Sequence, residues 1–309
     1  MKKISFLIAA HNEEKIIAET LENLLKVPYK NYEVIIGLDG CTDNTEEIVK
    51  KYSKKFKKIK YFKLNLRRGK PEVIDNIIKR ATGEIIIIND ADWKFKVGSK
   101  KLMDKFISVF DNPQVGGIVE SFPVEWERSK LNKGNIGYLM VAYSSYFWIN
   151  FQKENLTIKK GDHWVIKDPF MFLTNIFRKK LYQKNFSLGD DFERTKNILE
   201  KGYDLVIFKD INMPRRIAVY NKIRVLDIFK QKIRTAIARK QLNEISQTKL
   251  PFLNYYIKLG KYMLFKSWKE GFNVGFLILL WMFLTGLGEL ISKFKKGDTK
   301  KGWELRMKR

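Results

Sequence analysis

Two aspartates, separated by one residue, follow a run of four isoleucines. The run covers residues 85–88, and Asn89 then leads to Asp90 and Asp92. Alternate side chains of an extended segment point the same way, so both carboxylates can converge on one hard cation, which takes oxygen ligands and can share them with substrate phosphates. The same residues also fit a turn that merely ends a strand, and their spacing does not separate these two interpretations.

Acids in this position need a sheet that holds them at its edge. Four consecutive isoleucines are typical of a parallel strand that is buried on both faces, and ligands bind beyond the carboxyl ends of such strands. Strands are expected at 4–10, 32–38, 60–64 and 85–88, with helices at 13–25, 44–56 and 71–80 between them. This alternation predicts an α/β fold with a mostly parallel, doubly wound sheet, and it places Asp39 on the same edge as Asp90.

Composition narrows the class of protein. The chain has 309 residues, of which 45% are hydrophobic and 14% aromatic, so it folds rather than remaining disordered. Lysine and arginine exceed the acids by 60 to 34, and the net charge of +26 favours anionic partners such as nucleotides, phospholipid surfaces or nucleic acid. The single cysteine, Cys41, excludes a disulfide framework, so a bound metal is expected to have oxygen ligands. The apolar run before His11 is too short for a secretory signal, and we expect it to form the first strand.

The C-terminal part of the chain is more apolar than the rest. Residues 272–292 are close to the roughly 20 residues that a membrane span needs, and lysines flank both ends, so charge does not orient the segment. A span, a re-entrant hairpin and a buried helix remain open. Residues 252–268 mix aromatic residues with lysines, which is typical of a helix at a membrane interface. An amphipathic helix packed on the catalytic domain is the alternative.

Further motifs occur in order over the first hundred residues. They are Ala9–Glu14, Leu38–Thr45, Arg67–Lys70 followed by Ala81–Glu84, and Asn89–Asp92. Together they resemble the motifs of the inverting glycosyltransferases of family 2, which have the nucleotide-sugar-binding fold called GT-A. The resemblance implies a GT-A catalytic domain over residues 1–222, with a nucleotide-binding half at 1–115 and an acceptor half at 116–222. A helical, membrane-associating region would follow at 223–309.

The same resemblance implies roles for single residues. The nucleotide and donor sugar would be bound by Ala9, His11, Glu13, Asp39, Lys70, Asp90, Ala91 and Asp92. Within this set, Asp39 would contact the nucleobase, Lys70 the diphosphate, and Asp92 with Asp90 a divalent metal, either Mg²⁺ or Mn²⁺. A structural histidine at position 11 and a solvated lysine at position 70 are the alternatives.

Two later motifs concern the acceptor. The segment Leu188–Arg194 resembles the family's Gly-Asp-Asp segment, which implies that Asp191 is the general base, an effect worth roughly 10²–10⁴ in rate. Asp190 either raises the basicity of Asp191 by its charge or caps the following helix. Gln231 and Arg234 resemble a Gln-x-x-Arg-Trp motif of polysaccharide-forming relatives, but Thr235 replaces the tryptophan. Both residues are therefore candidates for acceptor or diphosphate contacts, or an ordinary polar pair on a helix.

These observations predict an inverting, metal-assisted transfer of sugar from a UDP- or GDP-sugar to a hydroxyl of a membrane-held glycolipid or lipid-linked glycan. The enzyme would act at the cell membrane with its catalytic domain on the cytoplasmic side. A polyprenyl-phosphate glycosyl synthase is an alternative, although an ionised acceptor needs no base. A processive polysaccharide synthase is another, although one apolar segment builds no channel. Nucleic acid is not an expected partner, because the charge is dispersed and no nucleic-acid-binding motif is visible. A membrane-anchored binding protein that keeps a transferase fold without its activity is a further alternative. The presence of Asp39, Asp90, Asp92 and Asp191 argues against it.

Overall fold

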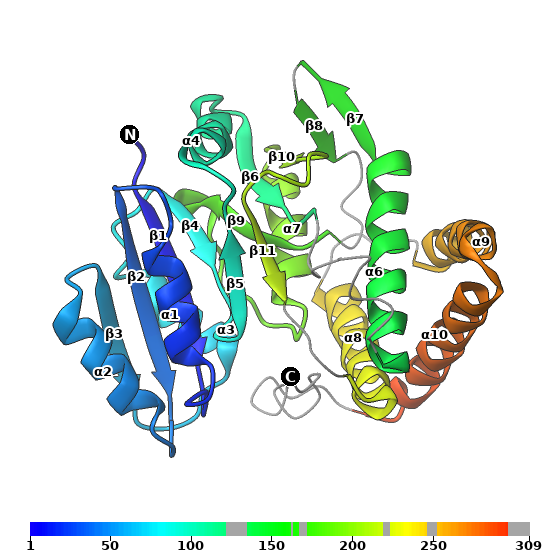
Figure 1. Cartoon of the computed structure of the whole chain (residues 1–309), viewed down its shortest axis with the longest axis horizontal. Coiled ribbons are helices and arrows are strands. Elements are labelled where there is room, and N and C mark those ends of the chain that lie inside the picture. The colour runs from blue at the N-terminus through cyan, green and yellow to red at the C-terminus, as the bar shows by residue number, and fades with distance from the viewer. Residues whose placement is uncertain (122–134, 162, 167–171, 219–222, 246–251, 296–309) are drawn as a thin grey trace. The chain divides into compact units, whose positions relative to one another are not determined.

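A computed structural model describes residues 1–121, 135–161, 163–166, 172–218, 223–245 and 252–295 (Figure 1). The chain divides into two compact units. The α/β unit comprises residues 1–121, 159–186 and 190–218, and the helical unit comprises residues 122–158, 187–189 and 219–309. Of the described residues, those of 135–158 are therefore grouped with the C-terminal region, whereas the sequence predicts a boundary near residue 222.

A nine-stranded sheet in the order β3-β2-β1-β4-β9-β6-β10-β8-β7 forms the framework. The strands are β1 (Ile4–Ala10), β2 (Tyr32–Asp39), β3 (Ile59–Leu64), β4 (Ile85–Ile88), β6 (Val115–Val119), β7 (Thr157–Lys160), β8 (His163–Ile166), β9 (Thr174–Arg178) and β10 (Asp204–Ile207). Parallel pairs join β3 to β2, β2 to β1, β1 to β4, and β6 to β10, while β9 lies antiparallel between β4 and β6. The predicted α/β class with a mostly parallel sheet is confirmed.

Helices cover both faces of the N-terminal strands. They are α1 (Ile17–Leu25), α2 (Thr45–Lys55) and α3 (Lys70–Ile78), with α4 (Lys100–Ser108) and α7 (Asp190–Glu200) farther along. Phe6 and Val34 pack in one core cluster with Leu21 of α1. On the other face α3 approaches so closely that a Cβ atom at Gly37 would lie 2.3 Å from Val73 Cγ1. Alternation of side chains across each strand therefore produces the doubly wound arrangement.

Two local details differ from the sequence prediction. Helix α1 begins at Ile17 rather than near residue 13, because the backbone N–H of Glu13 donates to Thr45 Oγ1 at 2.7 Å and the chain turns before entering the helix. A separate two-stranded sheet, β5 (Trp93–Lys96) with β11 (Arg215–Ala218), was not predicted. Its antiparallel pairing brings the segment after Asp92 to residues about 120 positions away in sequence.

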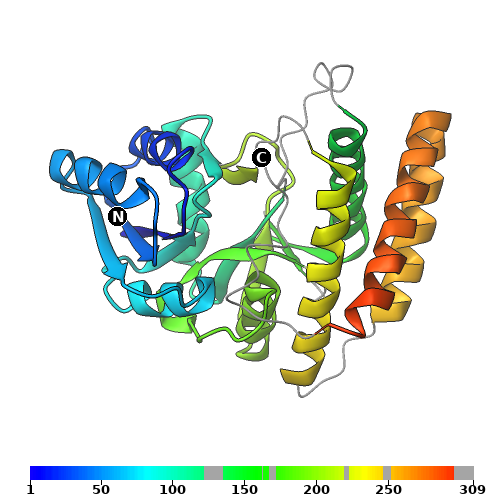
Figure 2. The ribbon, with the colours of Figure 1, turned by 90° about the horizontal axis from the view of Figure 1, so that it is seen from below.

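The described part of the helical unit contains four long helices: α6 (Ile136–Asn155), α8 (Val225–Ile245), α9 (Phe252–Glu270) and α10 (Phe272–Ser292). α6 contacts each of the other three, and α10 contacts α8 and α9 (Figure 2). The sequence did not predict α6, whose buried residues lie on several sides of the helix and leave no single apolar stripe. A helix of this kind is stabilised only when other helices surround it.

Among the residues that the structure describes, α10 is the helix that is long and apolar enough to cross a membrane. Its two sides differ. Val274, Ile278, Leu284 and Gly288 are buried. Phe272, Phe276, Leu279, Phe283 and Leu290 are exposed, at spacings of three, four or seven residues that place them on one side, and we call this set the α10 stripe. Contiguous exposed apolar surface of this kind marks a contact with a membrane or a partner.

Candidate functional site

Three strand ends bring predicted site residues to one edge of the sheet. β1, β2 and β4 are parallel neighbours, and their carboxyl ends lead into His11, Asp39 and Asn89 with Asp90 respectively. Because parallel strands present their carboxyl ends on the same edge, residues far apart in sequence meet there. The predicted gathering of these residues at one edge agrees with the structure.

Asp39 holds the loop that precedes Lys70. Its side chain is fully buried, and its two carboxylate oxygens accept the backbone N–H groups of Arg68 at 2.6 Å and of Gly69 at 2.9 Å. A carboxylate that accepts backbone N–H groups forms strong, charge-assisted hydrogen bonds. Asp39 thereby positions the first residue of α3, and its contact with a nucleobase stays a prediction.

The turn after β2 packs against the same loop. Gly40 adopts a φ of +59°, and a Cβ atom there would lie 2.7 Å from the backbone nitrogen of Arg67. Glycine is required because it alone combines this left-handed conformation with so close an approach. His11 reaches the turn from β1, with Nδ1 2.6 Å from the carbonyl oxygen of Asp39. His11 therefore supports the turn, which fits its structural interpretation.

Lys70 lies between two acidic segments. Its Nζ is 2.9 Å from Asp90 Oδ1 and 3.5 Å from Asp190 Oδ1. Burial works against the charged form, but the carboxylates of Asp190 and Asp90 outweigh it and raise the pKa of Lys70 above its usual value. Lys70 is thus a largely buried lysine whose charged form is favoured, and it joins the segment after β4 to the start of α7 rather than standing in solvent.

Arg216 is a second cation at this edge, and the sequence analysis missed it. It is almost fully buried, with Nε 2.7 Å from Glu120 Oε1 and Nη1 3.9 Å from Asp90 Oδ2. Its guanidinium lies over the ring of Trp93, 4.7 Å from the centroid. Burial raises the pKa of Glu120 despite the neighbouring guanidinium. The sequence contained a signal for the partner of Arg216, because Glu120 directly follows β6 at the carboxyl end of that strand.

Asp190 and Asp191 begin α7 and have different environments. Asp190 is buried, and its Oδ2 accepts a hydrogen bond from Arg194 Nη2 at 2.8 Å. Burial opposes ionisation of Asp190, yet Lys70 and Arg194 outweigh burial and lower its pKa. For Asp191, burial of the carboxyl and the adjacent Asp190 together raise the pKa. Environments that separate the pKa values of neighbouring acids in this way are typical of acid–base sites.

Asp90 and Asp92 are the two carboxylates that the sequence analysis assigns to a metal. Within the described ranges, no three His, Cys, Asp or Glu side chains are grouped as a metal site. Two carboxylates suit Mg²⁺ or Mn²⁺ when phosphate oxygens and water complete the shell, because such ions are often bound by one or two carboxylates together with substrate phosphates. The donor set therefore fits a cation that arrives with a diphosphate.

Ala9, Glu13 and Ala91 are the remaining residues that were predicted to bind the donor. Ala9 lies in the ladder opposite Gly37, and Ala91 is fully buried with its carbonyl oxygen accepting from Thr20 Oγ1 at 2.6 Å. Glu13 is also buried. Donor contacts by Ala9, Glu13 and Ala91 stay predictions.

Gln231 and Arg234 belong to α8 in the helical unit. Arg234 Nη2 lies 3.5 Å from the carbonyl oxygen of Leu188, and Leu188 N–H donates to Gln241 Oε1 at 2.9 Å. The two contacts tie α8 to the short segment that precedes Asp190. An acceptor or diphosphate role for Gln231 and Arg234 stays a prediction.

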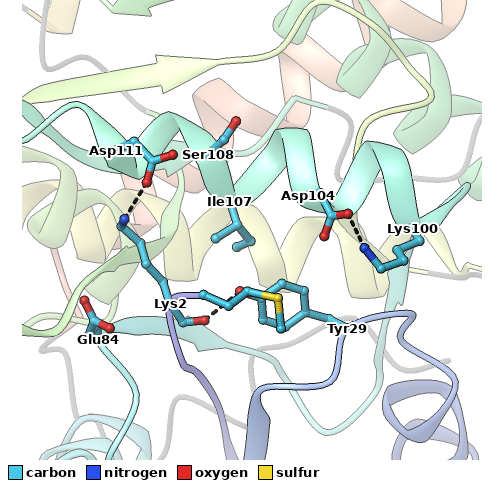
Figure 3. A pocket seen from close by; sticks show the side chains of 9 residues that line it. Lys2, Tyr29, Glu84, Lys100, Asp104, Ile107, Ser108 and Asp111 are labelled. Atoms are coloured by element: carbon cyan, nitrogen blue, oxygen red, sulfur yellow. Dashed lines mark hydrogen bonds and ion pairs between the residues drawn. The ribbon is translucent and has the colours of Figure 1, made fainter.

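A cavity of about 590 Å³ lies at the other edge of the sheet (Figure 3). Lys2 and Glu84, which precede β1 and β4, help to line it, so it faces the amino ends of these strands. Its charges pair with one another: Lys2 with Asp111 and Lys100 with Asp104, each at 2.5 Å. This cavity contains none of the predicted donor, metal or base residues and is distinct from the acidic edge.

Comparison with known proteins identifies the family. A family model described as "Glycosyl transferase family 2" matches residues 5–181, more than half of the chain. The poly-beta-1,6-N-acetyl-D-glucosamine synthase of Staphylococcus epidermidis is 39% identical over 89 residues, 29% of this chain and 21% of that protein. The beta-monoglucosyldiacylglycerol synthase of Nostoc is 34% identical over 119 residues, 37% of this chain and 25% of that protein. The matches span about a fifth to a quarter of these relatives.

Solved structures share the fold. A mannosyltransferase of Pyrobaculum calidifontis, in complex with GDP-Man and Mn²⁺, aligns with a TM-score of 0.55 at 15% identity over 98% of this chain and 78% of that one. Residues 1–349 of S. aureus TarS, in complex with UDP-GlcNAc, align with a TM-score of 0.50 at 14% identity over 95% and 92%. Identities this low show the fold alone. The chain belongs to glycosyl transferase family 2, a family of enzymes, and has the GT-A fold of these neighbours.

Proposed function

We propose that this chain transfers a sugar from a UDP- or GDP-sugar to a hydroxyl of a membrane-held glycolipid or lipid-linked glycan, with inversion at the anomeric carbon. The observation that carries the proposal is the position of Lys70 between Asp90 and Asp190 at the carboxyl edge of the sheet. This position supports the proposal, because the cation proposed to bind the diphosphate then lies beside both the acid proposed to bind the metal and the segment that contains the proposed base. The neighbouring folds in complex with GDP-Man and with UDP-GlcNAc support the donor class.

On the donor side, the residues are suited to a departing diphosphate. Lys70 and Arg216 place two cations beside Asp90 in a largely buried setting, where charge interactions are stronger than in water. A divalent cation held by Asp90 and Asp92 would, when bound, offset the charge that develops on the leaving nucleoside diphosphate. When the donor binds, Lys70 would exchange its contact with Asp90 for one with a phosphate oxygen, because a lysine carries its charge on a flexible four-carbon side chain.

On the acceptor side, Asp191 is the proposed base. Its raised pKa makes it a stronger base than an ordinary aspartate, while Lys70 and Arg194 keep its neighbour Asp190 ionised. Asp191 would take the proton from the acceptor hydroxyl as that oxygen attacks the anomeric carbon and the nucleoside diphosphate leaves from the opposite side. A single displacement of this kind inverts the configuration. An ionised polyprenyl phosphate would not need such a base.

The proposal that the acceptor is held in a membrane rests on the helical unit. The α10 stripe presents large apolar side chains to the surroundings, and the lysines of α9 and of residues 293–296 suit an anionic lipid surface. A related protein is the beta-monoglucosyldiacylglycerol synthase of Nostoc, whose name describes a lipid product. We propose a location at the cell membrane with the α/β unit on the cytoplasmic side, where nucleotide sugars would reach it.

The substitution Asp191→Asn tests the base. Transfer from a panel of UDP- and GDP-sugars, with Mg²⁺ or Mn²⁺ added, should fall by about 10²–10⁴ relative to the unmodified chain. Calorimetric titration with the matching nucleoside diphosphate should show unchanged affinity, because the donor residues remain. Asp204→Asn is the matched control, since Asp204 pairs with Lys160 at the surface and should leave transfer unchanged. Full activity in Asp191→Asn would rule out the assignment.

A processive synthase is the second candidate, favoured by similarity to the poly-beta-1,6-N-acetyl-D-glucosamine synthases. Product sizing with a defined glycolipid acceptor separates the two. The proposal expects products longer by one or a few sugars, because the described helices include a single one able to span a membrane. Long ladders of product would establish processive synthesis instead.

A further inference from the structure

A cavity of about 670 Å³ lies within the helical unit, between α8, α9 and α10. Its volume is in the range of roughly 300–1,000 Å³ that is usual for small-molecule sites. The side chains that define it, apart from the small residues considered below, are Arg239, Lys240, Asn243, Glu244, Leu253, Tyr256, Leu259, Met263, Trp281, Met282, Thr285, Glu289 and Lys293. We call it the helical cavity.

Small residues create this space and open it outward. Gly260 of α9 and Gly286 of α10 both line the cavity. A Cβ atom at Gly286 would meet no atom within 4 Å, whereas one at Gly260 would lie 3.0 Å from Met282 Cε. Gly286 is exposed and falls three residues after Phe283 and four before Leu290, so it is on the same side of α10 as the α10 stripe. The cavity therefore opens on the apolar surface.

The lining is apolar over one part and charged over another. Leu259, Met263 and Trp281 provide apolar walls. Arg239 is 5% exposed, donates to Tyr256 Oη at 2.9 Å and forms an ion pair with Glu289. A buried guanidinium is costly in apolar surroundings unless it is paired, so a charge in this place suggests a function.

The charged part favours an anion. Its cations are Arg239, Lys240 and Lys293, and its carboxylates are Glu244 and Glu289. Cations thus exceed acids, and the side chain of Glu289 is 44% exposed, so a second anion can approach the guanidinium without removing a deeply buried partner. Arginine binds phosphate through paired hydrogen bonds. Apolar walls, a mouth on an apolar surface and an excess of cations match the two ends of a phosphate-bearing amphiphile.

We propose that the helical cavity binds one phospholipid-like amphiphile, with its hydrocarbon chain along the apolar walls and its phosphate beside Arg239. The lipid enters sideways from the membrane across the α10 stripe. A fatty-acyl phosphate and an isoprenoid phosphate share this chemistry, and the test distinguishes them. The binding of a lipid in this cavity does not depend on the proposed function. Only the further statement, that the bound lipid is the sugar acceptor, rests on that proposed function.

The test uses the full-length chain in detergent and two light-activated probes, one a phosphatidic acid and the other a polyprenyl phosphate. Mass spectrometry locates the crosslinks. We expect at least one probe to label α9 or α10 at the cavity, and Gly286→Leu, which fills the open space, to lower that labelling about tenfold. Phe265→Trp, which enlarges an exposed residue of α9 outside both the cavity and the α10 stripe, is the matched control and should label as the unmodified chain does. Thermal unfolding should show that both variants are folded.

Arg239→Gln tests the headgroup. It should lower labelling by the phosphate probes about tenfold and leave labelling by the matching uncharged diacylglycerol or polyprenol probe unchanged. Equal labelling of Gly286→Leu and the unmodified chain, or crosslinks only outside the cavity, would overturn the proposal even if Arg239→Gln fails to fold. Labelling by one phosphate probe alone identifies the chain type and supports the proposal. Asp191→Asn should label normally, so failure of lipid binding and failure of the proposed transfer are read separately.

Discussion

Lys70 Nζ lies 2.9 Å from Asp90 Oδ1, so the first residue of α3 is joined to the acid that follows β4. Asp39 determines where Lys70 lies, because its carboxylate holds the backbone of Arg68 and Gly69 directly before it. The proposed diphosphate-binding cation and the proposed metal-binding acid are therefore each other's partners before a donor binds. Donor binding would replace the contact between Lys70 and Asp90 by contacts with phosphate and metal. A substitution of Lys70 is therefore the most direct test of the site.

Lys70→Met should weaken binding of the nucleoside diphosphate at least tenfold and lower transfer by about 10²–10³, as loss of one electrostatic contact in an active site does. The physical reason is that Asp90 and Asp190 would then face a diphosphate without the intervening cation. Calorimetry and a transfer assay give the two quantities. Lys79→Met is the matched control, because Lys79 pairs with Asp75 on the exposed surface at the other end of α3. Equal affinity in both variants would contradict the assignment of Lys70.

The rate of transfer should depend on pH through Asp191. A base acts in its ionised form, so activity is present above its pKa and is lost as the pH falls through that pKa. Burial and Asp190 raise this pKa, which moves the acidic limb of the profile above the range of an ordinary aspartate. The limb should be absent from the residual rate of Asp191→Asn and should persist in Asp111→Asn, which alters an exposed acid. An acidic limb shared unchanged by all three proteins would assign it to another group.

Arg216 should contribute to stability as well as to the site. Arg216→Met leaves the buried Glu120 without its cation, whereas Asp90 keeps Lys70, and we expect the free energy of unfolding to fall by about 3–5 kcal/mol. Replacing Glu120 by leucine in the same protein should recover part of that loss, since no buried charge then lacks its partner. Urea unfolding measures both effects. Lys100→Met, which breaks an exposed pair with Asp104, should cost no more than about 1 kcal/mol. Equal losses for the two variants would contradict the buried pairing.

Close packing of α3 on β2 should make Gly37 sensitive to one added carbon. Gly37→Ala places a methyl group 2.3 Å from Val73 Cγ1, and overpacking of this kind costs about 1–3 kcal/mol. In the double variant with Val73→Ala the two changes should compensate, because the alanine removes the clashing carbon. Urea unfolding of the two single variants and the double variant measures the coupling. Strictly additive losses would show that the helix moves instead.

Much of the sheet edge that carries Asp39 and Asp90 was predictable, because its structure follows from local sequence patterns. An apolar run buried on both faces predicts a central parallel strand, and the acids that follow it lie at its carboxyl end. The expectation that Asp90 and Asp92 alternate along an extended segment is wrong, because β4 ends at Ile88 and the chain turns, with Trp93 N–H donating to the carbonyl oxygen of Asp90 at 3.0 Å. The chain order of strands and helices then places Asp39 and Asp90 on one edge. The family motifs also predicted roles for Lys70 and Asp191, because each of these residues lies within a short motif that can be recognised in the sequence.

Other features depend on which distant segments meet. In sequence, Arg216 resembles any of the chain's many basic residues, and only the antiparallel pairing of β11 with β5 buries it beside Glu120 and Asp90. The opposite pKa shifts of Asp190 and Asp191 likewise need Lys70 and Arg194 in place.

The sequence by itself determined the parallel sheet, the acids at its carboxyl edge and the family, because these follow from local periodicity and short motifs. Tertiary structure alone decided that β9 runs antiparallel between β4 and β6, that α6 packs with the C-terminal helices, and that Asp39 holds the loop before Lys70. The physical reason is that the burial and pairing of a side chain depend on partners tens to hundreds of residues away. The sequence around that side chain does not identify those partners.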